Sequence, residues 1–395
     1  MKCRKLKNGN WECYEEGPKD PFTNKRNAIR KQSKSKMTAK QKVKETLDAL
    51  SDGIDSKNAD RVTFNQVAQE WLKVYSVTGV KKSTIRQREF AIQNISPYIG
   101  HMPINRITHG IMQNLILDLD KRNYSPSHLS GVKVAANFIF KHAIRHRLRM
   151  DNPVEDIVMP KKRMTVEEIE NEEIPDKYFE REELERFLKA AVEKGLENDV
   201  EWFYLMAFTG MRTGEVCALK WSDVDFEGKT VRVTKTLDNP SGNKHKYELT
   251  PPKTKRSIRV IELDDEILEI LKAHKKRQAK IRLKFRKQYE DYDDGNFVFC
   301  REDGYPYYGR LIFRHTVRLC KLAGLSKIEG PHIIRHTYIT MLAEAGVDLP
   351  TIMQRVGHED SKTTTKIYTH ITKAMKRDAT QQVHSHFGNL FKLNQ

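Results

Sequence analysis

The spacing of apolar residues predicts helices over much of the chain. Thr63 and Gln66 have the spacing of a capping box, and apolar residues then recur every three or four positions as far as Tyr75. Three further segments show the same period, with turn-rich stretches between them: residues 83–96, 109–121 and 126–147. We expect a compact unit of four helices here.

Beyond residue 177 the pattern alternates between helix and strand. Helical periodicity covers residues 180–194 and 199–208 and ends at Gly210. Three short segments with strand composition follow, "KTVRVTKTL", "KYELTP" and "RSIRVIEL", before helical patterns resume. This segment predicts a mainly α domain that contains a small antiparallel sheet.

The first 55 residues carry a third pattern. Asn8 and Gly9 form a turn signal, a second turn-rich stretch reads "GPKDPFTNKR", and short strands are expected around them. The following segment has Thr38 in the position of an N-cap and Gly53 beyond its end. We predict a small three-stranded sheet with one helix, and the alternative is a disordered basic tail.

Composition separates these patterns into domains. The stretch "TVEEIENEEIPD" carries six acidic residues and neither Lys nor Arg, as expected for an extended interdomain linker. The sequence therefore predicts a multidomain α+β protein. Its parts are residues 1–55, a helical bundle at 62–160, an acidic linker at 161–176 and a mixed domain at 177–395.

The net charge indicates a polyanionic partner. The chain has 71 Lys and Arg against 53 Asp and Glu, a formal charge of +18 and a pI of about 9.5. Twelve of those basic residues, against four acidic ones, lie in the first 40 positions. Phosphate backbones attract such a surface, although a basic protein without a polyanionic partner is also compatible with composition alone.

Other features of the composition limit the class of protein. No apolar run approaches the 18 or so residues of a membrane helix, and the start "MKCRKLKNGN" lacks an apolar signal core, so we expect a cytoplasmic protein. The cysteines are odd in number and widely scattered, which predicts reduced packing residues rather than disulfides or a zinc site. They are Cys3, Cys13, Cys217, Cys300 and Cys320.

The segment "GPHIIRHTYIT" places polar residues in an otherwise apolar helix. His332 and Arg335 are three positions apart and share a face, so they must be paired or must line a cleft. The next segment, "VDLPTIMQRVGH", predicts a second helix with Asp348 as its cap, and Tyr368 follows ten residues after His358.

Three interpretations of these residues compete. Zinc binding by His332 and His336 is disfavoured because no Glu follows the first His and because Arg335 places a fixed charge beside the ion. A helix–turn–helix that binds DNA passively is the second, and a phosphoryl-transfer site is the third. We expect His336 to have a packing or supporting role and Tyr338 to belong to the core.

Four sequence blocks favour the third interpretation, the phosphoryl-transfer site, because together they resemble a known family. In order they are "TGMRTGEVCALKWSDVDF", "PPKTKRSIRVIEL", "HIIRHTYIT" and "VGHEDSKTTTKIYTHI". Their residues and gaps resemble the signature of the tyrosine recombinase, or phage integrase, family over about 160 residues. More loosely, the N-terminal region and the helical unit resemble the arm-binding and core-binding domains of integrases from temperate phages and conjugative transposons.

The resemblance implies a role for each matching residue. Lys255 competes with Lys253 for the position of the hairpin lysine, and we prefer Lys253 because Thr follows it, as in the family. The implied catalytic residues are Arg212, Lys253, His332, Arg335, His358 and the nucleophile Tyr368, with Glu215 in support.

The chemistry of these side chains fits such a reaction. Two guanidinium groups suit the charge that develops on a phosphodiester under attack. A tyrosine is a weak nucleophile at pH 7 and needs activation, for which His332 is a suitable base. Lys253 is suited to protonate the departing 5′ oxygen, and His358 to donate a hydrogen bond to the phosphate.

The resemblance further implies strand exchange without a metal ion or other cofactor. Tyr368 would form a 3′-phosphotyrosyl link, and four protomers would join two duplexes through a Holliday junction, so that a mobile element is integrated or excised. An excision factor and a host DNA-bending protein are expected partners, and association with the nucleoid is expected. The alternatives are a type IB topoisomerase and a non-catalytic DNA-binding regulator.

Double-stranded DNA with core-type and arm-type sites is the implied substrate. Basic residues in the two N-terminal parts are the candidates for contacts with it. They are Arg4, Lys5, Lys7, Lys25, Arg26, Lys81, Lys82, Arg86, Lys141 and Arg145.

Overall fold

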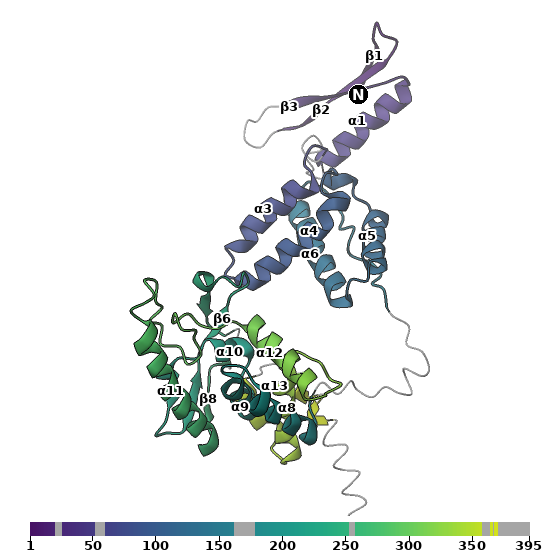
Figure 1. Ribbon diagram of the computed structural model, residues 1–395. Helices are drawn as coiled ribbons and strands as arrows, with labels where there is room; N and C mark the ends of the chain where they lie inside the picture. The colour runs from purple at the N-terminus through teal and green to yellow at the C-terminus, as the bar shows by residue number, and fades with distance from the viewer. Residues whose placement is uncertain are drawn as a thin grey trace, which may run out of the picture. The chain divides into compact units, whose positions relative to one another are not determined.

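The chain forms two compact units, Met1–Thr165 and Val166–Gln395 (Figure 1). The computed structural model describes residues 1–19, 26–51, 60–161, 178–252, 257–357, 364–365 and 367–369. The predicted acidic linker, apart from residue 161, therefore lies outside the described residues.

The first unit begins with the predicted small sheet. Strands β1 (Lys2–Lys5), β2 (Trp11–Lys19) and β3 (Arg26–Ser33) pair antiparallel in the order β1-β2-β3. Helix α1 (Lys36–Ser51) packs along this sheet (Figure 1). The prediction of Thr38 as its N-cap is wrong, because the backbone is already helical from Lys36, where Lys and Met favour that conformation.

The prediction that all five cysteines are reduced is also wrong. Cys3 and Cys13 are joined by a disulfide, with their Cα atoms 4.1 Å apart. The two residues lie directly opposite each other in the β1–β2 ladder, across the turn at Gly9, whose φ is +82°. Their sequence separation of ten residues did not indicate this pairing. The pairing depends on the register of the hairpin. Buried Cys217 fits the prediction, and its burial raises the pKa of its thiol to about 12.

Four helices follow, as the apolar spacing predicts. They are α3 (Phe64–Ser76), α4 (Lys82–Ile99), α5 (His109–Lys121) and α6 (Pro126–Arg145), with a short 3-10 helix at Ile104–Arg106. The capping box of Thr63 and Gln66 is present at the start of α3. Phe138 on α6 stacks on Trp71 of α3, with ring centroids 5.9 Å apart, so α3 and α6 share one apolar interface.

The second unit contains the mixed domain. Its helices are α8 (Arg181–Lys194), α9 (Asp199–Thr209), α10 (Thr213–Cys217), α11 (Asp265–Phe285), α12 (Gly309–Leu322), α13 (His332–Glu344) and α14 (Leu349–Val356). Apolar residues lie on all sides of α9, which accordingly contacts α8, α10, α11 and α13. This helix is the centre of the domain.

The strands of this unit form two small antiparallel sheets. They are β4 (Val224–Asp225), β5 (Thr230–Val233), β6 (Thr236–Asp238), β7 (Glu248–Thr250) and β8 (Arg259–Glu262). One sheet has the order β4-β5-β8 and the other joins β6 to β7. The segment "KTVRVTKTL", which the sequence predicts as one strand, therefore forms two strands, β5 and β6. The two strands pair with different partners. The α+β prediction is confirmed.

Helices α13 and α14 carry a separate small cluster of apolar residues. Asp348 caps α14 by accepting a hydrogen bond from the amide of Thr351, and Gly357 ends it with a φ of +67°, both as predicted. The cluster consists of Tyr338, Ile339, Ala343, Ile352 and Val356, and Ile367 and Tyr368 pack against it. In the described part of the chain, no helix is long and apolar enough to span a membrane.

The disulfide is expected to stabilise the N-terminal sheet. Closing a loop of about ten residues adds about 2.5 kcal/mol in the chain-entropy model. Reduction should therefore accelerate amide hydrogen exchange in β1 and β2, and a Cys3→Ser variant should exchange like the reduced protein. Amides of α9 provide the internal control and should not change. Equal exchange rates in oxidised and reduced protein would show that the bond does not stabilise the sheet.

Candidate active site

The turn between α9 and α10 places Arg212. Gly210 has a φ of +62°, and a Cβ atom at this position would lie 2.4 Å from the ring of Tyr338, so glycine is required on both counts. Arg212 is the N-cap residue that precedes α10. Its amide donates to Oε2 of Glu215 at 2.9 Å, and its Nη1 donates to Oε1 at 2.9 Å.

Arg335 enters from the first turn of α13 and is almost fully buried, with 2% of its surface exposed. Its guanidinium donates to the carbonyl oxygens of Gly210 and Val356. Burial, together with the charge of Arg212, lowers the pKa of Arg335, but a guanidinium keeps its proton in proteins. A full positive charge is therefore held at a position that little water reaches.

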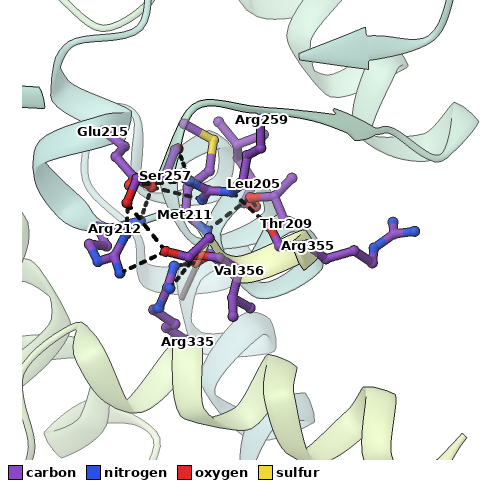
Figure 2. A network of polar contacts seen from close by, with 12 residues as sticks. Leu205, Thr209, Met211, Arg212, Glu215, Ser257, Arg259, Arg335, Arg355 and Val356 are labelled. Atoms are coloured by element: carbon purple, nitrogen blue, oxygen red, sulfur yellow. Dashed lines mark hydrogen bonds and ion pairs between the residues drawn. The ribbon is translucent and has the colours of Figure 1, made fainter. Parts of the chain in front are cut away.

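Three arginines meet at the C-terminal end of α14 (Figure 2). Arg259 Nε donates to the carbonyl of residue 355 at 2.7 Å, Arg335 to that of residue 356, and Arg212 Nη2 to that of residue 357 at 3.5 Å. The last carbonyls of a helix have no partner within it, and its dipole favours cations there. These contacts fix the chain immediately before His358.

Glu215 supplies the negative charge of this network. Its side chain is 4% exposed and accepts hydrogen bonds from Arg212 and from both terminal nitrogens of Arg259, at 3.3 and 2.9 Å. Burial opposes its ionisation, but the hydrogen bond from Arg259 and the charges of both arginines outweigh burial and lower its pKa. The carboxylate is ionised at neutral pH and holds the two guanidinium groups in place.

Arg259 is the residue of this network that sequence reasoning missed. Along β8, residues alternate between buried and exposed positions, and Arg259 occupies an inward position with 6% of its surface exposed. A charged residue at an inward strand position needs a buried partner, and this was the available signal. The partner itself, Glu215, lies 44 residues earlier in the chain.

The network has an excess of positive charge. Among its described side chains, the guanidinium groups of Arg212, Arg259 and Arg335 face the single carboxylate of Glu215, so positive charge exceeds negative by two (three minus one). Arg212 keeps a third of its side chain exposed. Such an arrangement suits an anion that approaches from solvent, and the fork of a guanidinium matches phosphate oxygens.

His332 begins α13, three residues before Arg335, and is exposed. Protein atoms around its ring still remove part of its hydration, and this effect, with the charges of Arg335 and Arg212, lowers its pKa. The imidazole is therefore neutral at pH 7 and able to accept a proton.

Tyr368 is half-buried and packs against the cluster formed by α13 and α14. Lys253, Lys255 and His358 lie outside the described residues. Two described residues that border these segments are in contact, because Ser257 Oγ donates a hydrogen bond to the carbonyl of Gly357 at 3.4 Å.

Two further predictions concern α13. Tyr338 belongs to the core, as predicted, with 4% of its surface exposed and its hydroxyl accepting a hydrogen bond from Arg355 Nε at 3.0 Å. His336 is half-buried. Among the described residues, neither His332 nor His336 belongs to a group of three side chains arranged to hold a metal ion.

Comparison with known proteins gives a consistent result for sequence and fold. The profile of the phage integrase family matches residues 177–375, and that of the phage integrase N-terminal SAM-like domain matches residues 63–119. The integrase of Staphylococcus phage L54a is 30% identical over 362 residues, covering 87% of this chain and 97% of the relative. The prophage ps2 probable integrase of Lactococcus lactis subsp. lactis (strain IL1403) is 30% identical over 380 residues, covering 94% of this chain and 96% of the relative.

Solved structures share the fold. The Tn1549 transposon integrase in complex with transposon right end DNA has a TM-score of 0.62 at 22% identity, covering 82% of this chain and 99% of that one. A lambda integrase dimer bound to a COC′ core site has a TM-score of 0.54 at 16% identity, covering 93% and 94%.

Replacing Glu215 by Gln is expected to destabilise the second unit strongly. The change leaves Arg259 buried without its counter-charge, which typically costs about 3–5 kcal/mol. Because the pKa of Glu215 is lowered, its stabilising effect is present above the ordinary carboxyl pKa and disappears as pH falls through the lowered value. Urea unfolding at pH 7 measures the loss. Glu262→Gln, at an exposed position of β8, the strand that carries Arg259, is the control, and equal stability of the two variants would contradict the assignment.

Proposed function

The chain belongs to the phage integrase family and is a site-specific tyrosine recombinase that acts on DNA, and from this premise we propose that it integrates and excises a mobile element through a 3′-phosphotyrosyl intermediate. One observation carries the proposal. Arg212 and Arg335 converge on the end of α14, and Tyr368 of the same chain packs against the α13–α14 cluster. The nucleophile and its electrostatic partners are thus attached to the same pair of helices.

In this proposal the scissile phosphate binds beside the two arginines. The excess positive charge of the network stabilises the additional negative charge that forms on the non-bridging oxygens. The buried network positions the guanidinium groups before DNA arrives, so little reorganisation is needed during the reaction.

The remaining residues of the proposed site transfer protons or donate a hydrogen bond to the phosphate. His332, neutral because its pKa is lowered, accepts the proton of the Tyr368 hydroxyl. Lys253, with Lys255 as the alternative, protonates the departing 5′ oxygen, and His358 donates a hydrogen bond to the phosphate. These last roles come from the family resemblance, and the anchoring of Ser257 and Gly357 supports them.

The proposed reaction has two transesterification steps. Tyr368 attacks phosphorus to form a 3′-phosphotyrosyl bond while the 5′ oxygen leaves, and the 5′ hydroxyl of a partner duplex then attacks that bond and releases the tyrosine. One phosphoester replaces another at each step, so neither ATP nor a redox partner is required. Four protomers would carry out two rounds of exchange through a Holliday junction.

The helical unit is proposed to bind core-type DNA. Arg86 and Arg88 of α4, with Ser125 and His128 at the start of α6, line a hollow of about 610 Å³. The N-terminal end of a helix and two guanidinium groups together favour a phosphate at this position. Exposed Lys82, Lys141 and Arg145 extend the basic surface, and half-buried Lys81 lies at the start of α4.

The N-terminal sheet is proposed to bind arm-type DNA. Arg4, Lys5 and Lys7 are exposed in this region. Arg4 also forms an ion pair with Glu12 at 2.7 Å, and this pairing would compete with a contact to DNA. Lys25 and the side chain of Arg26 lie outside the described residues. An excision factor, a host DNA-bending protein and an association with the nucleoid in the cytoplasm complete the proposal.

Tyr368→Phe is expected to abolish covalent attachment to DNA while leaving affinity nearly unchanged. The test uses end-labelled duplex that spans the ends of the mobile element encoding this chain, nicked so that the cleaved strand is trapped, and denaturing gels that detect label on protein. Tyr338→Phe, in the same cluster, is the matched control and should still be labelled.

Two results would count against this function. Label on Tyr368→Phe would assign the nucleophile to another residue. Relaxation of supercoiled plasmid by the wild type without joining of two duplexes would favour a topoisomerase instead.

The pH dependence of covalent attachment is expected to reflect His332. Because its pKa is lowered, attachment should persist as pH falls to the ordinary histidine value near 6.5 and decline only below it. His332→Gln should react more slowly and lack this decline. DNA binding measured at each pH separates the effect from weakened affinity, and an unchanged profile in the variant would exclude His332 as the base.

A further inference from the structure

A second group of potential ligands lies in the helical unit, far along the chain from the recombination residues. Glu70 of α3 and the pair His142 and His146 at the end of α6 place one carboxylate oxygen and two ring nitrogens within 4.8 Å of one another. We propose that Glu70, His142 and His146 form a binding site for a divalent transition-metal ion of the Zn²⁺ class. The family resemblance implies strand exchange without a metal ion, so this site would be separate from the recombination chemistry.

The donor set matches the chemistry of such an ion. Two imidazoles and one carboxylate suit Zn²⁺ and neighbouring first-row metals, and a water molecule can complete a tetrahedron. The two histidines are four positions apart on one helix, which places them on the same face, and their ring centroids are 4.2 Å apart.

His142 gives independent evidence for a ligand. Its surface is only 8% exposed, and its Nε2 is buried without a hydrogen-bond partner. Buried ring nitrogens are nearly always satisfied, so an orphaned one calls for an explanation. Glu70 Oε1 lies 3.9 Å from this nitrogen, which is beyond hydrogen-bonding range.

Only a small movement of side chains is required to bind a metal ion. Bonds of about 2.0–2.1 Å in a tetrahedral site separate ligand atoms by about 3.3 Å. The carboxylate of Glu70 is about half exposed and His146 is exposed, so both side chains are able to rotate toward His142. The helices themselves are already fixed against each other by the stacking of Trp71 on Phe138.

The local charges mostly favour a cation. Glu70 contributes one negative charge, and His146 occupies the C-cap of α6, where the helix dipole is negative. Arg145 is the basic neighbour that opposes binding, but it is exposed and well hydrated. A bound ion would link α3 to α6 and so fix the helix that carries Lys141 and Arg145, two of the candidate DNA contacts.

The proposal is tested on the full chain without a histidine tag, stripped of metal with EDTA and then titrated with Zn²⁺ and with Co²⁺. The wild type should bind one ion at this site, show visible Co²⁺ absorption of a four-coordinate complex and unfold several degrees higher with Zn²⁺ than in EDTA. His146→Gln and Glu70→Gln, both at exposed positions, should each weaken binding at least about tenfold and remove the thermal shift.

His109→Gln is the matched control, because His109 is exposed at the start of α5 in the same unit. It should retain the Co²⁺ spectrum and the thermal shift. Equal Co²⁺ binding by wild type and His146→Gln would overturn the proposal. So would a wild type that binds no ion and is destabilised by Glu70→Gln in EDTA, since Glu70 and His142 would then form only a hydrogen bond. Neither result depends on recombination activity.

Discussion

The candidate active site depends on the contact between Glu215 and Arg259. Both side chains are buried, and each would be strongly unfavourable without the other. The same carboxylate orients Arg212, so it joins the turn after α9 to strand β8. The positive charges that suit a DNA phosphate are thus held in position by an interaction that itself faces away from solvent.

Backbone geometry brings these side chains together. Gly210 and Gly357 both adopt the left-handed conformation, and each allows a close approach, of Tyr338 in the first case and of Arg259 in the second. At Gly357 an added Cβ would lie 3.1 Å from Arg259 Nη1. Small residues at two chain reversals therefore set the positions of much larger groups, and neither glycine takes part in the chemistry.

Local signals predicted most of the helices, whereas pairings between distant residues were not predictable. The capping box at Thr63 and the end of α14 at Gly357 are encoded within a few residues and appear as expected. The disulfide, the split of one strand between two sheets and the role of Arg259 all depend on tertiary neighbours. Likewise, His142 and His146 repeat the spacing of His332 and His336, but only the fold brings Glu70 beside them.

The end of α14 is held by side chains from three separate elements. Arg212 precedes α10, Arg259 lies in β8 and Arg335 lies in α13, and they bind three successive carbonyl oxygens. The position of the segment that leads into residue 358 is therefore set jointly by parts of the chain that lie far apart in sequence. A displacement of α10, β8 or α13 would remove one of the three hydrogen bonds that hold this segment.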